Sequence, residues 1–336
     1  MKVMFNLGLI SKYKVALMGL SIILIVLGHA RASGVVYPFL LDKLIIASMG
    51  TICFFLLSGM GMYYSLSKLD SFNVGQLFHW YKKRYTRLLV PYFILSIPIF
   101  AINIIHEGGS FVDFILRVTT VSFWYSPHEG MWFIAMIIPL YLLSPIVFEV
   151  VKKLKHQWLV IILYSAILIM MIMIAKYSTF SDDYFYKAMF FFIGMWIAPS
   201  IKKGRRVNWV LIVFFTLILY GIALYFPILK DVPRYLFLFP AFLFIVCAGY
   251  EWLCRYSKNV ISRFSDFLGR ISLEMYLTHV YFAGLFMQFH VVLFPKSPLL
   301  TAYLQYTIVI VFSIICSTWV NRLSKRFSEW ILAVKQ

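Results

Sequence analysis

The sequence predicts an all-α, polytopic integral membrane helical bundle with about ten transmembrane helices. Apolar residues make up 62% of the 336-residue chain, charged residues only 13%, and the mean hydropathy is +0.87, which excludes a soluble globule with a charged surface. About 20 apolar residues cross a bilayer as a helix, and ten stretches approach that length. They lie near 15–31, 45–65, 88–105, 131–151, 157–175, 184–200, 207–226, 235–253, 271–293 and 299–320.

The distribution of positive charge orients these spans. Cytoplasmic loops of membrane proteins carry an excess of Lys and Arg. If the N-terminus is inside, most of the 31 basic residues fall in inner segments, so both termini are expected in the cytoplasm. Loops beside anionic lipid headgroups then explain the net charge of +18, and no nucleic-acid partner is expected.

The segments between the spans leave no room for a second domain. The longest, near 66–87 and 106–130, are about twenty residues each, too short to bury an independent core. Residues 1–336 are therefore expected to form a single transmembrane domain. The four cysteines show no CxxC spacing, so neither a disulfide framework nor thiol chemistry is expected.

His29 ends the first span, which is otherwise an uncharged apolar run from Val15. An imidazole at that depth costs free energy unless something uses or satisfies it, so His29 is a candidate functional residue. The alternative is a signal peptide, because lysines precede the run and Ala30-Arg31-Ala32 resembles a cleavage site. The length of the run, the Arg inside that site and the spans that follow favour a retained helix.

Five local patterns follow one another along the chain. They are His29, the run FFLLSGM at 54–60, the run YKKRYTRLLVPY at 81–92, MWF at 131–133 with YLLSP at 141–145, and LGRISLEMYLTH at 268–279. Over about residues 14–320 they together resemble the membrane acyltransferase-3 family, whose members O-acylate cell-envelope polysaccharides and related acceptors.

The resemblance implies an enzyme that moves an acyl group, expected to be acetyl, from cytoplasmic acyl coenzyme A to a hydroxyl of a cell-envelope carbohydrate or lipid-linked glycan. It also implies a multi-pass protein of the bacterial cytoplasmic (inner) membrane. His29, neutral near pH 7, would act as general base toward the acceptor hydroxyl. Glu129, at the outer end of the fourth span, is the candidate partner for the other imidazole nitrogen, or else a solvated acid of the outer loop.

The donor side of the site is expected on the cytoplasmic face. The resemblance places the phosphates of acyl coenzyme A at the basic cluster of the third span, and guanidinium groups suit phosphate oxygens. An ordinary positive-inside anchor is the alternative. The candidate residues are Lys82, Lys83, Arg84 and Arg87, with Ser58 lining the donor channel or else packing a helix contact.

The first span departs from the family at one position. The family places an Arg eleven residues before the histidine, where this chain has Met18. Lys14, one turn nearer the cytoplasm, is the candidate substitute. It stands fifteen residues before His29, or roughly 22 Å of helix, so an extended pantetheine arm could join the two across a bilayer core. The departure leaves open an active enzyme with altered donor handling or a degenerate member.

Trp132, Trp124, Tyr141 and His279 are expected to bind the acceptor or to border the channel, although membrane aromatics need no ligand to explain them. The seven histidines show no metal-ligand spacing, so no metal is expected. Two other functions stay open: an exporter of a glycan or lipid, and a catalytically silent scaffold in polysaccharide assembly.

Overall fold

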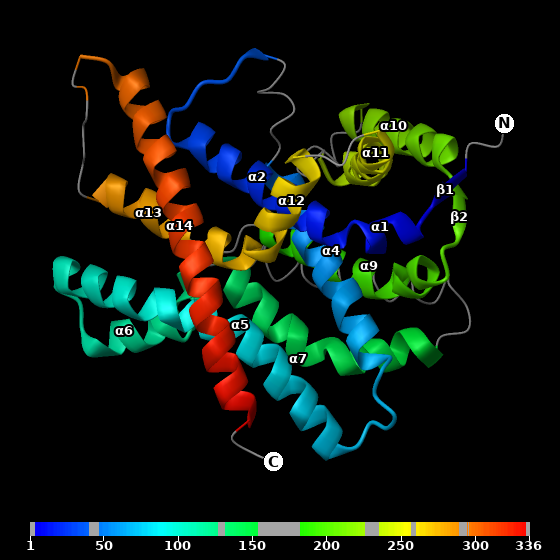
Figure 1. Ribbon diagram of the computed structural model, residues 1–336, viewed down its shortest axis with the longest axis horizontal. Helices are drawn as coiled ribbons and strands as arrows, with labels where there is room; N and C mark the ends of the chain where they lie inside the picture. Colours follow the sequence, from blue (N-terminus) through cyan, green and yellow to red (C-terminus); the bar gives the residue numbers. More distant parts are fainter. Residues whose placement is uncertain are drawn as a thin grey trace.

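The computed structural model of the chain is a bundle of helices (Figure 1). It describes residues 4–39, 47–126, 132–153, 182–225, 235–256, 260–288, 294 and 296–333. Within these ranges, seven helices are long and apolar enough to cross a membrane. They are α2 (Lys14–Ala32), α4 (Ala47–Leu66), α5 (Val74–Glu107), α7 (Trp132–Lys153), α9 (Asp182–Lys202), α11 (Tyr235–Tyr256) and α14 (Pro298–Ala333). The protein is a multi-pass integral membrane protein.

These seven helices coincide with seven of the ten predicted spans. Two further predictions correspond to helices of 17 residues each, the apolar α10 (Trp209–Tyr225) and α13 (Ser272–Gln288). The span predicted near 157–175 lies outside the described residues.

Helix α5 is much longer than the span predicted at 88–105. It begins at Val74, where the side chain of Asn73 accepts a hydrogen bond from the Gln76 amide. It ends at Glu107 and is capped by Gly108, whose φ of 71° favours glycine. Its 34 residues extend over about 50 Å, longer than the hydrocarbon core of a bilayer. The basic cluster at 82–87 is therefore part of a helix that continues into the membrane.

Helix α4 contacts α2, α7, α9 and α11. Its approach to α9 is close because each helix offers a glycine at the crossing. A Cβ at Gly59 would lie 1.9 Å from the Phe191 carbonyl oxygen, and one at Gly194 would lie 2.1 Å from that of Leu56. Small residues that let backbones approach are typical of helix contacts in membranes.

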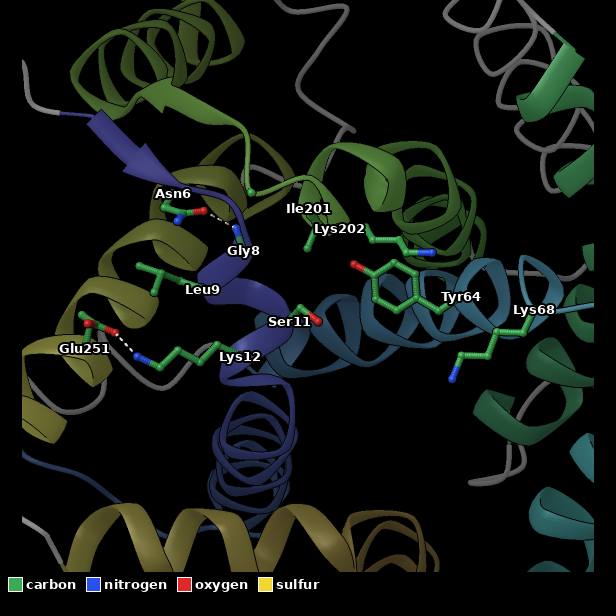
Figure 2. A pocket seen from close by; sticks show the side chains of 11 residues that line it. Asn6, Gly8, Leu9, Ser11, Lys12, Tyr64, Lys68, Ile201, Lys202 and Glu251 are labelled. Carbon is green, nitrogen blue, oxygen red and sulfur yellow. Dashed lines mark hydrogen bonds and ion pairs between the residues drawn. The ribbon is translucent and has the colours of Figure 1, made fainter.

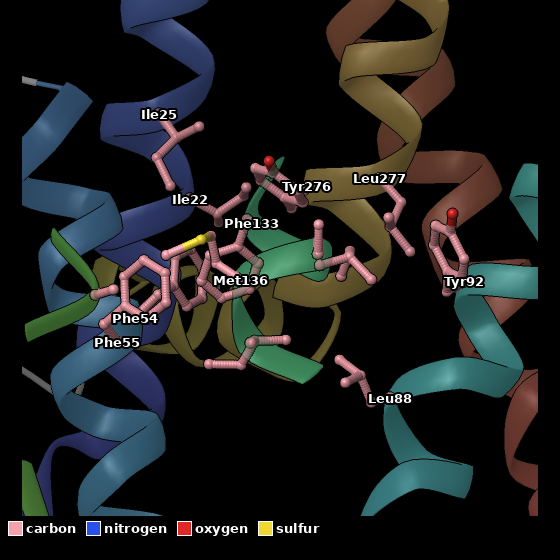
Figure 3. Packing of buried hydrophobic residues seen from close by; sticks show 14 of the residues in the cluster. Ile22, Ile25, Phe54, Phe55, Leu88, Tyr92, Phe133, Met136, Tyr276 and Leu277 are labelled. Carbon is pink, nitrogen blue, oxygen red and sulfur yellow. The ribbon is translucent and has the colours of Figure 1, made fainter. Parts of the chain in front are cut away.

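Two hydrophobic clusters fill the bundle. In the larger one, side chains from many of the helices meet, among them Ile22, Phe55, Tyr92, Phe133 and Tyr276 (Figure 3). Large apolar side chains also lie exposed on the outer faces of α10 and α14. An exposed apolar surface of this kind suits contact with lipid.

Short elements complete the described chain. Strands β1 (Met4–Asn6) and β2 (Arg206–Asn208) pair antiparallel and so tie the N-terminal segment to the connection between α9 and α10. The other short elements are α1 (Gly8–Lys12), α6 (Phe111–Val118), the 3-10 helix η1 (Ser122–Trp124) and α12 (Val260–Arg270).

Candidate functional site

A pair of imidazoles lies inside the bundle. His29 Nδ1 on α2 and His279 Nε2 on α13 are 2.8 Å apart, within hydrogen-bond distance. His279 Nδ1 lies 2.7 Å from the backbone oxygen of Met275, one turn earlier on α13. His279 is fully buried, whereas His29 keeps some exposure.

The contact with Met275 determines which nitrogens carry protons. A carbonyl oxygen only accepts, so His279 Nδ1 must donate to it, and a neutral His279 then accepts at Nε2. His29 must therefore donate from Nδ1, which leaves its Nε2 with a free lone pair. The arrangement holds His29 in the tautomer that a general base requires.

Close helix packing brings the two histidines together. Gly19 of α2 and Gly269 of α12 lie where these helices cross, and a Cβ at either would come within 1.9 Å of a carbonyl oxygen of the other helix. Only Ile271 separates α12 from α13, so the crossing also holds α13 against α2. The glycine of the LGR motif thus has a packing role that supports the site.

A group of three cations lies toward the other end of α2. Lys14 lies near enough to Arg84 and Arg87 for the three charges to repel one another. None of the three forms an ion pair with a described residue. The buried Arg84 Nε also has no hydrogen-bond partner in the described part of the chain. The Glu274 carboxylate is within electrostatic range of Arg87 but forms no ion pair with it. Three like charges without an ion pair favour an anionic ligand at this place.

Hydrogen bonds to neighbouring helices hold α5 in register at this cluster. Trp80 Nε1 donates to Ser65 Oγ of α4 at 2.8 Å. The Tyr81 and Tyr85 hydroxyls donate to backbone oxygens of α7 at 2.7 and 2.9 Å. Arg84, between these two tyrosines in sequence, therefore has a fixed place relative to α4 and α7.

Ser58 and Tyr141 lie beside the cations. Tyr141 lies close to Ser58 and is within electrostatic range of both Arg84 and Arg87. Ser58 therefore faces the basic group, while its neighbour Gly59 packs against α9.

The other two basic residues of the cluster, Lys82 and Lys83, are not joined to this group. Lys82 is half-buried and Lys83 is exposed, and neither makes a hydrogen bond or ion pair with a residue of the described ranges.

Three of the four predicted acceptor residues, Trp124, Trp132 and His279, join in a chain of aromatic rings, whereas Tyr141 lies beside the cation group. Trp132 stacks on Tyr184 with centroids 4.8 Å apart, and Tyr184 meets Phe123 at 5.7 Å. Trp124, 42% exposed, packs edge-on against Phe123 at 5.4 Å. On the other side, Tyr276 contacts His279 at 5.9 Å, and Phe133 bridges Trp132 and Tyr276. Aromatic contacts thus extend from an exposed rim to the imidazole pair.

Sequence reasoning missed Lys187. This buried lysine on α9 pairs with Asp183, and its ammonium lies 5.4 Å from the Trp132 ring centroid and 5.8 Å from that of Tyr235. It is also within electrostatic range of His29. The signal was present, since an Asp and a Lys four residues apart in an apolar span are costly unless they have a role.

Two residues that bear on His29 in the sequence are Glu129, its candidate partner, and Met18, which stands in the family's Arg position. Glu129 lies outside the described residues. Met18 is half-buried and packs against both hydrophobic clusters, so the residue in the family's Arg position belongs to the core.

The fold and these groups define the class of the protein: a polytopic helical membrane protein with an imidazole pair and a cation group at different depths along one helix. A family model described as an acyltransferase domain, that of the acyltransferase-3 family, matches residues 16–322. The chain belongs to this family and is a membrane acyltransferase. No curated protein and no solved structure matches the chain.

Proposed function

We propose that the protein transfers an acyl group, acetyl by preference, from cytoplasmic acyl coenzyme A to a hydroxyl of a cell-envelope carbohydrate or its lipid-linked precursor. The observation that carries the proposal is the hydrogen bond of 2.8 Å between His29 and His279, which leaves His29 Nε2 free to accept a proton. In this proposal His279 takes the orienting role expected of Glu129.

His29 acts as the general base. Its Nε2 takes the proton of the acceptor hydroxyl while the oxygen bonds to the thioester carbon. The carbon–sulfur bond then breaks, and the leaving sulfur receives that proton from His29, giving an ester and a free thiol. Throughout the cycle His29 Nδ1 donates to His279, so the ring stays oriented as its positive charge forms and disappears.

Lys14, Arg84 and Arg87 bind the phosphates of the donor. Support comes from their clustering without ion pairs and from the unpartnered Arg84 Nε. Lys14 supplies the charge that Met18 lacks. Lys82 and Lys83 extend the positive field outward, and Ser58 with Tyr141 borders the entrance of the thioester arm.

The donor and acceptor sides face opposite surfaces of the membrane. Lys14 and His29 lie on one continuous helix, and their spacing of fifteen residues corresponds to roughly 22 Å. In the proposed orientation both termini are cytoplasmic, residues 1–336 form one domain, and the membrane is the bacterial inner membrane. The acyl group therefore crosses most of the bilayer while the nucleotide stays inside.

The aromatic chain from Trp124 to Trp132 receives the acceptor. Aromatic faces pack well against sugar rings, and the exposed edge of Trp124 gives access from outside. A carbohydrate lying on these rings would have a hydroxyl directed toward His29.

Thiol release tests the proposal. Purified protein with acetyl coenzyme A and a carbohydrate acceptor should release free thiol, and His29→Ala should abolish the release in a folded protein. His79→Ala is the matched control, since His79 is exposed at the start of α5. Full activity in His29→Ala would refute the mechanism. Transport of labelled glycan across vesicles without any acyl donor would support an exporter instead.

A further inference from the structure

A cavity of about 730 Å³ lies beside α1, at the end of the bundle where α4 and α9 finish (Figure 2). Its volume is in the range of small-molecule sites. Neither histidine of the imidazole pair lines it, and neither does Lys14 or Arg84. It is therefore a second candidate site, distinct from the one described above.

The cavity carries an excess of positive charge. Lys12 and Glu251 line it as a pair, with Nζ and Oε2 2.8 Å apart, and their charges compensate. Lys68 and Lys202 also line it, and neither forms an ion pair with any residue that the structure describes. Two uncompensated ammonium groups favour an anionic ligand such as a phosphate ester.

Tyr64 lines the same cavity, and its hydroxyl is unsatisfied by the described residues. Tyr64 Oη is buried and lies beside Ser11, yet it makes no hydrogen bond of normal geometry within the described ranges. In Figure 2, Lys68 and Lys202 lie on either side of the Tyr64 ring, and the hydroxyl points toward α1. A buried hydroxyl without a partner costs free energy, and a ligand oxygen would remove that cost.

A second cavity of about 400 Å³ adjoins the first and shares Asn6, Leu9 and Glu251 with it. Phe5 and Trp252, which is 61% exposed, give this cavity an apolar side, and Arg255, paired with Glu251, also lines it. Tryptophan is typical of the membrane–water interface. The two cavities together offer a charged lobe around Lys68 and Lys202 and an apolar lobe at Phe5 and Trp252, and in the proposed orientation both lie at the cytoplasmic end of the bundle.

We propose that this double cavity binds one anionic phospholipid of the inner leaflet. Its phosphate lies between Lys68 and Lys202 and accepts a hydrogen bond from Tyr64, and its glycerol and acyl end follows the apolar lobe at Phe5 and Trp252. The apolar lobe favours a lipid over a soluble phosphate ester. The inference uses the proposed orientation in the membrane but none of the proposed chemistry.

Native mass spectrometry of the full-length protein in detergent tests this site. Phosphatidylglycerol should remain bound in preference to phosphatidylcholine. The double variant Lys68→Ala/Lys202→Ala should weaken phosphatidylglycerol binding by about tenfold or more, as expected for two lysines at headgroup depth. Tyr64→Phe should weaken it by a smaller factor, about threefold, because one hydrogen bond is lost.

The control variant is Lys203→Ala/Lys152→Ala, which removes the same charge from exposed positions that line neither cavity. It should bind phosphatidylglycerol like the unmodified protein. An equal loss in this control, or equal binding of the two lipids, would overturn the proposal. So would a loss of coenzyme A binding, with lipid binding intact, in the Lys68→Ala/Lys202→Ala variant.

Discussion

The ammonium group of Lys14 occupies the space that a side chain at Gly61 would fill. A Cβ at Gly61 would come within 2.9 Å of Lys14 Nζ. Helix α4 therefore leaves room for the lysine to reach Arg84 and Arg87 from one turn below Met18. This complementarity explains how the chain keeps a cation of the first span near Arg84 and Arg87 without the family's arginine.

Lys14→Ala should raise the KM for the acyl donor by about tenfold or more, because one charge-assisted contact to phosphate is lost. Gly61→Ala should also raise the KM for the acyl donor, but by a smaller factor, because it displaces the Lys14 ammonium group without removing its charge. Steady-state kinetics with varied acetyl coenzyme A checks both. Gly221→Ala is the control, because nothing lies within 4 Å of a Cβ there. An unchanged donor KM in Lys14→Ala would remove Lys14 from the donor site.

His279→Leu should lower kcat by about a hundredfold or more with little change in either KM, because His29 loses the group that fixes its tautomer. His279→Gln should keep more activity, since its amide can accept from His29 and donate to Met275. The double variant His29→Ala/His279→Leu should be no slower than His29→Ala alone. Additive losses would show that the two histidines act independently.

Lys187→Met should raise the KM for the acceptor while the donor KM stays constant. The buried ammonium holds Asp183 and lies near the Trp132 and Tyr235 rings, so its loss loosens the aromatic surface. Kinetics with varied acceptor and fixed donor provides the measurement. If the donor KM changes instead, Lys187 belongs to a different part of the site.

Gly59→Ala and Gly194→Ala should each strongly destabilise the protein. An added methyl group would meet a carbonyl oxygen of the facing helix at about 2 Å, so α4 and α9 would have to separate. Thermal unfolding in detergent is the measurement, and Gly221→Ala should melt like the unmodified protein. Equal melting temperatures of all three variants would mean that α4 and α9 can move apart at their crossing without loss of stability.

Helix α6 should lose its N-terminal cap in acid. The Ser110 hydroxyl and amide donate to Asp113, which lowers the pKa of that carboxylate below its ordinary value. A lowered folded-state pKa means that the stabilisation is present at neutral pH and is lost as the pH falls below about 4. Hydrogen exchange in Phe111–Val118 should therefore accelerate in acid beyond the intrinsic change. Asp113→Asn should remove this pH dependence, and its persistence there would exclude the Asp113 carboxylate as the cause.

Relationships along one helix were predictable from the sequence. Lys14 and His29 lie on α2 as the apolar run indicated, and Arg84 and Arg87 share α5 with a spacing of three residues. Local periodicity determines such relationships, because a helix fixes the rise and angle between its residues. The same local signals did not show that α5 starts at Val74, because a polar helical segment outside the membrane carries no apolar signature.

The contact between His29 and His279 was not predictable in this way. It depends on the crossing of α2 and α12 at Gly19 and Gly269, a packing relationship between distant segments. The sequence identified both histidines as candidates but assigned His279 to the acceptor side. Only the three-dimensional arrangement joins them.

The separation of the two imidazoles by 250 residues also constrains how the protein is made. Synthesis delivers α2 to the membrane early and α13 only near the end, so His29 has no orienting partner while most of the chain is being inserted. A newly made chain can already contain the whole cation group of Lys14, Arg84 and Arg87 when it still lacks an oriented base. Under the proposed function, a protein shortened between α7 and α13 would keep Lys14, Arg84 and Arg87 but would lack the partner that orients His29.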